Sequence, residues 1–176
     1  MSNLITLFKR NKQFAKDFNT PNLPMLPKLG TVVLTCADSR VDPAHIFKLD
    51  LGESLVMRNT GGRVTQEIIK EIASIVFMVS KAGGDKSGSF ELIIMHHTDC
   101  GAERFANPEL QHALKKNMGI DVSSLAITDH EKSLYEDIEC LRNSPIIPGY
   151  VIVSGCIYDV KDGSVREIIK PAALSS

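Results

Sequence analysis

The chain has 176 residues, of which 43% are hydrophobic and 23% are charged, as is usual for one globular domain. Its formal net charge of −1 and its scattered lysines and arginines argue against nucleic acid or a membrane as partner. No apolar run approaches the roughly 18 residues of a membrane span, and the N-terminus lacks the features of a secretory signal. We therefore expect a cytoplasmic protein with four reduced cysteines, which act as ligands, catalytic groups or core residues.

The first segment of the chain is expected to be a helical arm. Apolar residues recur with helical spacing over residues 1–18, and three prolines at positions 21, 24 and 27 then favour an extended connector. We treat residues 1–176 as a single domain, in which residues 1–28 form the N-terminal helix and its Pro-rich connector.

The remaining segments alternate between predicted strands and predicted helices. In chain order we expect strands at 31–36 and 54–59, a helix at 65–81 with Thr65 as its N-cap, a loop at 83–89, a strand at 90–96, a helical region broken near 117–121, a helix at 129–141, and strands at 150–157 and 164–169 joined by a turn at 162–163. Such alternation predicts an α/β fold with a mostly parallel central β-sheet flanked by helices. Ligand sites in sheets of this kind lie beyond the C-terminal ends of the strands.

Three side chains with metal-ligand chemistry fall at such strand ends. Cys36 closes the first predicted strand, and His97 and Cys100 follow the third. Two thiolates and one imidazole suit zinc, and three protein ligands leave the fourth tetrahedral position open, as in catalytic zinc sites. The alternative is that these cysteines are small core residues, since His-x-x-Cys alone is a weak signal. We apply that alternative to Cys140 and Cys156, in a predicted helix and a predicted strand.

The order of the motifs resembles that of the β-carbonic anhydrase family. C-A-D-S-R stands at 36–40, G-E-x-x-x-x-R-N-T-G-G at 52–62 and H-T-D-C-G at 97–101, so the specific motifs fall within roughly residues 28–105. The resemblance implies one zinc ion per chain, held by Cys36, His97 and Cys100. It also implies that Asp38 and Arg40 form a catalytic pair, and that either water or Asp38 itself fills the fourth zinc position at rest.

The activity implied by the resemblance is the reversible hydration of carbon dioxide to bicarbonate by zinc-bound hydroxide. An alternative is hydrolysis of carbonyl sulfide to hydrogen sulfide and carbon dioxide by the same mechanism, because the short members of the family also resemble such hydrolases. A second alternative is a non-catalytic, zinc-stabilised module whose fourth metal position is closed. A thiol redox protein is disfavoured because the chain has no C-x-x-C motif.

Two pairs of residues receive roles beside the metal. Asp38 and Arg40 are two positions apart, so in an extended segment their side chains share a face and pair, which keeps Asp38 ionised and oriented towards the attacking water. Gly61 and Gly62 permit a positive φ or a close backbone approach. The resemblance implies that they line the substrate site, and a plain turn between strand and helix is compatible with that role.

Some features bear on substrate and assembly. Asp50 stands where many relatives have a substrate-contacting Gln, and His96 stands where many have Gly. His96 either narrows the pocket or is turned away by the alternation of the strand. The resemblance also implies that the helical arm packs on a partner subunit, giving a homodimer or homotetramer, whereas the alternative is an arm folded back on its own domain.

Overall fold

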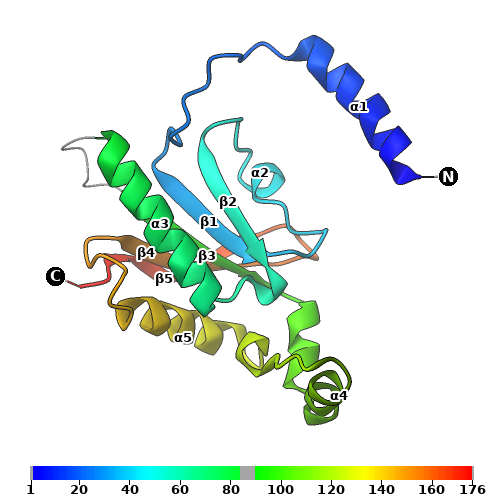
Figure 1. Ribbon diagram of the computed structural model, residues 1–176, viewed down its shortest axis with the longest axis vertical. Helices are drawn as coiled ribbons and strands as arrows, with labels where there is room; N and C mark the ends of the chain where they lie inside the picture. The colour runs from blue at the N-terminus through cyan, green and yellow to red at the C-terminus, as the bar shows by residue number, and fades with distance from the viewer. Residues whose placement is uncertain (1, 84–89, 176) are drawn as a thin grey trace.

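A computed structural model describes residues 2–83 and 90–175 of the protein (Figure 1). The elements in chain order are α1 (Asn3–Asp17), β1 (Thr31–Cys36), α2 (Pro43–Ile46), β2 (Ser54–Asn59), the 3-10 helix η1 (Thr60–Gly62), α3 (Gln66–Gly83), β3 (Glu91–His97), the 3-10 helix η3 (Gly101–Ala106), α4 (Pro108–Met118), the 3-10 helix η4 (Ser123–Leu125), α5 (His130–Arg142), β4 (Ile152–Tyr158) and β5 (Val165–Ala173). The loop predicted at 83–89 lies, from residue 84 onwards, outside the described residues.

One five-stranded sheet organises the molecule, in the order β2-β1-β3-β4-β5. The first four strands are parallel to their neighbours, and β5 pairs antiparallel with β4, so the predicted α/β fold with a mostly parallel sheet is confirmed. Strand β5 continues past the predicted end at residue 169 and includes Pro171. An edge strand tolerates this proline, because only one side of its backbone has to pair with the sheet.

The main core lies between one face of the sheet and two long helices. Helices α3 and α5 run across the same face in Figure 1, and their buried side chains, such as Ile72 and Leu134, pack with Leu34 and Leu92 of the central strands. A smaller apolar cluster on the other face includes Ile46 of the short helix α2. The parallel strands are thus covered on both faces near the ends from which the site residues project.

Helix α1 stands apart from the sheet, to which the connector joins it (Figure 1). The predicted helix is present, and Ser2 caps its N-terminus by accepting from the amide of Leu4. None of the described residues of α1 is buried, and its apolar side chains, Phe8 among them, face solvent in the single chain. None of the helices in residues 2–83 and 90–175 combines the length and apolar character needed to cross a membrane.

Local sequence signals account for several element ends. The hydroxyl of Thr65 accepts from the amide of Ile68, which confirms it as the predicted cap of α3. The predicted break near 117–121 corresponds to Gly119, a left-handed C-cap after α4. The core interpretation is right for Cys156, which is buried, but wrong for Cys140, which is exposed. Cys140 falls outside the buried stripe of α5, whose members include Leu134, Ile138 and Leu141.

Candidate metal centre

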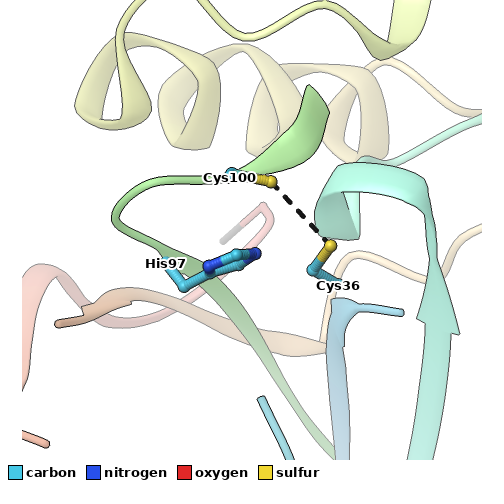
Figure 2. Close-up of side chains that lie close together, drawn as sticks. All are labelled: Cys36, His97 and Cys100. Atoms are coloured by element: carbon cyan, nitrogen blue, oxygen red, sulfur yellow. Dashed lines mark hydrogen bonds between the residues drawn. The ribbon is translucent and has the colours of Figure 1, made fainter. Parts of the chain in front are cut away.

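Cys36, His97 and Cys100 meet at the C-terminal end of the sheet. Cys36 is the last residue of β1 and His97 the last of the adjacent parallel strand β3, while Cys100 comes three residues later, before η3. Their sulfur and nitrogen ligand atoms all lie within 4.8 Å of one another, and all three residues are buried. The two sulfurs are 3.8 Å apart, and Figure 2 shows the imidazole beside them. The three residues chosen from the sequence are thus brought together by the fold.

The imidazole of His97 is oriented as a metal ligand requires. Its Nδ1 lies 3.0 Å from the carbonyl oxygen of Thr98, which can only accept, so Nδ1 carries the proton. Its Nε2 therefore presents a lone pair, and this buried atom has no hydrogen-bond partner among the described residues. A buried polar atom without a partner is costly, and coordination of a cation would satisfy it. The donor set of two sulfurs and one imidazole fits zinc.

The surroundings of the two thiols favour charge on Cys36. The pKa of Cys36 is lowered to about 4, first by the hydrogen bond from Cys100 and further by the backbone amides of Asp38 and Gly61. The amide of Gly61 donates to the Cys36 sulfur at 3.3 Å. The pKa of Cys100 is raised, because its proton is held by Cys36 and because it is buried. A divalent cation would stabilise both thiolates at once.

Asp38 and Arg40 form the pair expected from their spacing, and a second carboxylate joins them. Arg40 donates to both oxygens of Asp38, with Nε at 3.0 Å and Nη2 at 2.8 Å, and its Nη1 donates to Asp99 Oδ2 at 2.7 Å. The pKa values of Asp38 and Asp99 are both lowered, in each case first by hydrogen bonding to Arg40. Asp99 was not identified from the sequence, and its φ of 54° marks it as a constrained residue beside Cys100.

The loop after β1 is fixed by another arginine. Arg58 of β2 donates to the carbonyl oxygens of Cys36, Asp38 and Val41. These bonds hold the segment that carries both a metal-ligand candidate and the Asp38–Arg40 pair. Arg58 belongs to one of the sequence motifs, but its role is not visible in the sequence because its partners are backbone atoms of a distant segment.

Gly61 and Gly62 form a tight turn against the same segment. Their φ values are +83° and +68°. A Cβ on Gly62 would lie 2.9 Å from the carbonyl carbon of Thr35, and one on Gly61 would lie 3.0 Å from the Cβ of Ala102. Glycine is therefore required here both by conformation and by close packing. A role towards substrate stays a prediction.

The two departures noted in the sequence lie away from the cluster. His96 shares the strand face of Leu92 and Ile94, is fully buried, and lies 3.3 Å from Asp137, so it does not narrow a pocket beside Cys36. Asp50 precedes β2 at the opposite end of the sheet, where it lines a cavity with residues of the connector. The alternation of β3 therefore decides the orientation of His96.

A carboxylate that the sequence does not point to supports Cys100. Glu103 Oε1 accepts the backbone amide of Cys100 at 3.0 Å, and His130 Nε2 lies 3.0 Å from the same oxygen. The pKa of His130 is lowered, mainly by burial. His130 begins helix α5, so this helix reaches the metal-ligand segment from 30 positions away in the chain.

The fold and the cluster together define a class: α/β proteins with a Cys₂His metal centre at the C-terminal ends of parallel strands. The sequence pattern of the family described as "Carbonic anhydrase" matches residues 31–137, which is more than half of the chain. The chain belongs to the β-carbonic anhydrase family. Members of this family use zinc, and the cluster found here is suited to hold one ion.

Individual relatives extend over most of the chain. A solved carbonic anhydrase from Streptococcus mutans is 39% identical, with a TM-score of 0.79, and the match covers 96% of this chain and 98% of that one. Beta-carbonic anhydrase 1 of Mycobacterium tuberculosis is 27% identical over 160 residues, which cover 90% of this chain and 93% of the relative. A carbon disulfide hydrolase of Acidithiobacillus thiooxidans is 28% identical, with coverage of 76% and 74%.

Proposed function

We propose that the protein catalyses the reversible hydration of carbon dioxide to bicarbonate, with one zinc ion held by Cys36, His97 and Cys100. The observation that carries the proposal is the convergence of three ligand atoms within 4.8 Å, with His97 Nε2 buried and its lone pair free. A zinc ion bound there supplies the Lewis acidity that makes water nucleophilic near neutral pH. In the overall reaction, the water oxygen bonds to the carbon of carbon dioxide and one proton leaves to solvent.

Asp38 acts as the residue that orients the attacking water. Arg40 binds both of its carboxylate oxygens and lowers its pKa, so Asp38 is ionised and can only accept hydrogen bonds. Asp99 holds the guanidinium of Arg40 from the other side. The water is thus presented with one lone pair directed at the substrate, which reduces the entropic cost of attack.

The surface next to the two sulfurs is apolar and suits a small, poorly hydrated substrate. Ala102 and Ile127 are buried against Cys36 and Cys100, and Phe105 packs against the same cluster. Gly61 and Gly62 bring backbone rather than side chains to the site, and we assign them to substrate contact. Close packing and apolar side chains around the thiolates exclude bulk water and strengthen the electrostatic interactions at the site.

Hydrolysis of a carbon–sulfur substrate, carbonyl sulfide or carbon disulfide, is the second candidate. It is favoured by the presence of carbon disulfide hydrolases among the relatives, one of which matches about three quarters of this chain. These molecules are linear like carbon dioxide, and the same attack by water on carbon applies to them. The small apolar cluster can accept any of these three molecules. The main substrate is therefore decided by comparing the catalytic efficiency on each of them.

The test measures metal content and turnover on one preparation. We expect about one zinc per chain by elemental analysis, and rapid proton release on mixing with carbon dioxide in a stopped-flow assay. Sulfide release from carbonyl sulfide and carbon disulfide is measured in parallel. Higher catalytic efficiency on a sulfur substrate would replace the first candidate by the second, whereas zinc without turnover on any of the three would identify a non-catalytic module.

We infer that the single domain assembles as a homodimer or homotetramer in a reducing, cytoplasmic environment. Support for assembly comes from α1, whose apolar residues are exposed in the single chain while the helix stands away from the sheet. Burying that surface against another subunit would recover its hydrophobic free energy. Support for a reducing environment comes from Cys36 and Cys100, which serve as ligands only when reduced.

A further inference from the structure

Asp137 is a buried carboxylate that the proposed reaction does not use. It lies in the middle of α5 and its side chain is 1% exposed, as is expected of a charged group only when it is fully paired. Its partner is Arg63, whose side chain is 8% exposed. The two residues are 74 positions apart in the chain, so this ion pair joins two distant segments.

Arg63 connects the pair to the glycine turn. Its Nε lies 3.1 Å from Asp137 Oδ1 and 3.0 Å from Oδ2, and its Nη1 donates to the carbonyl oxygen of Ala126 at 2.7 Å. The following amide, that of Val64, also donates to Asp137 Oδ1. Arg63 directly follows Gly62, so the end of the turn is held by a network in which both carboxylate oxygens are used.

The other side of the turn touches the metal centre. The side chain of Asn59 donates a hydrogen bond to the carbonyl oxygen of Arg63 and accepts one from its amide, which closes the turn around Gly61 and Gly62. Within that turn the amide of Gly61 donates to the Cys36 sulfur. The position of this donor therefore depends on where Arg63 is anchored.

Asp137 also contacts the strand that carries the imidazole. Its Oδ2 lies 3.3 Å from Nε2 of His96, which is fully buried on the face of β3 opposite to His97. The two atoms are close but lack the alignment of a hydrogen bond. One carboxylate thus touches both the turn that donates to Cys36 and the residue next to His97.

We propose that Asp137 and Arg63 are positioning residues for the metal centre, fixing the Gly61 amide against Cys36 and the end of β3 that presents His97. The inference rests on the zinc site proposed above. An ion pair with a purely structural role would change only the stability of the fold when it is altered. Such pairs are often replaceable by apolar residues without loss of stability. The positioning role predicts that changes at Asp137 alter the metal centre beyond any change in stability.

The experiment compares three variants of the full-length protein. Asp137→Asn removes the charge with little change of shape, and Arg63→Lys keeps the charge but loses the planar fork of donors. Leu134→Ala, a core truncation on the same helix, is the matched control for lost stability. Each variant is characterised by thermal unfolding, by zinc affinity in competition with a chelator, and by amide hydrogen exchange of Gly61 in the metal-free protein.

We expect Asp137→Asn and Arg63→Lys to weaken zinc binding about 10- to 100-fold, as changes behind metal ligands commonly do. We also expect the Gly61 amide to exchange at least about tenfold faster in both variants, since its donor geometry is released. Leu134→Ala should lower the unfolding temperature while keeping wild-type zinc affinity and Gly61 protection.

The proposal is overturned if Asp137→Asn and Arg63→Lys keep wild-type zinc affinity and Gly61 protection, or if Leu134→Ala weakens zinc binding as much as they do. If Asp137→Asn does not fold, Arg63→Lys decides by the same two measurements. A wild-type protein without zinc affinity would instead refute the proposed function. The exchange of Gly61 in the metal-free protein would still decide whether the ion pair positions the turn.

Discussion

Substituting alanine for Gly62 should damage the metal centre as well as the fold. Gly62 has a φ of +68°, which costs an L-residue about 1–2 kcal/mol. Its new Cβ would also lie 2.9 Å from the carbonyl carbon of Thr35 and 3.0 Å from the amide nitrogen of Cys36. Neither atom belongs to a flexible side chain, so strand β1 itself has to move at the residue that carries one of the sulfurs.

Gly119 offers a matched control for the conformational part of this cost. Its φ is +69°, nearly that of Gly62, yet apart from its own chain neighbours no atom of the described residues lies within 4 Å of its ideal Cβ. Gly119→Ala should therefore lose about 1–2 kcal/mol of unfolding free energy from backbone strain alone. In a chain of this size, each 1 kcal/mol lowers the unfolding temperature by about 2–4 °C. Gly62→Ala should exceed this shift, and the excess measures the clash with β1.

The assay is urea or thermal unfolding of both variants, with zinc content and carbon dioxide hydration measured on the folded fraction. We expect Gly119→Ala to keep zinc and turnover, and Gly62→Ala to lose at least about tenfold in zinc affinity because Cys36 is displaced. Equal destabilisation of the two variants, with zinc retained in both, would refute the reasoning. It would mean that β1 adjusts to the added methyl group without disturbing the ligands.

The remaining predictions concern the polar pair, its pH dependence and the assembly. Asp38→Asn should lower turnover by about 10²-fold or more while zinc content stays near one per chain, which separates orientation of water from metal binding. Arg40 lowers the pKa values of Asp38 and Asp99, so the stability that these two pairings contribute is fully present above about pH 4 and is lost as the pH falls further. Arg40→Ala should therefore make the free energy of unfolding less dependent on pH in this acid range. Phe8→Glu should shift the protein towards monomer in sedimentation velocity, and an unchanged sedimentation coefficient would argue against an interface at α1.

The sequence was most informative where local chemistry decides structure. Strand β1 has the predicted bounds because six consecutive β-branched, apolar or small residues are all buried in a central parallel strand. The three ligand candidates were identified because topology places the C-terminal ends of parallel strands together. The Asp38–Arg40 contact followed from a spacing of two residues, which needs no knowledge of the rest of the fold.

What escaped prediction depends on partners distant in the chain. Arg63 and Asp137 are unremarkable as sequence, and only the packing of α5 over the sheet makes them a buried pair. The same applies to Glu103, whose role depends on the amide of Cys100 and on His130. Burial was predicted wrongly for Cys140. Positions one or two residues away from a buried helix residue can be exposed, and residue type alone does not show which face of the helix Cys140 occupies.

The closeness of the two sulfurs has a consequence for the metal-free protein. At 3.8 Å apart, Cys36 and Cys100 need to approach by less than 2 Å to reach the bond length of a disulfide, about 2.05 Å. The low pKa of Cys36 also supplies the thiolate with which oxidation begins. Loss of zinc would therefore turn the centre into an oxidisable dithiol, and a crosslink between β1 and the segment before η3 would prevent reloading. Bound zinc would keep both sulfurs coordinated and so protect them from oxidation. The zinc-bound enzyme should therefore keep its activity in peroxide, whereas the metal-free protein should lose the ability to bind zinc again.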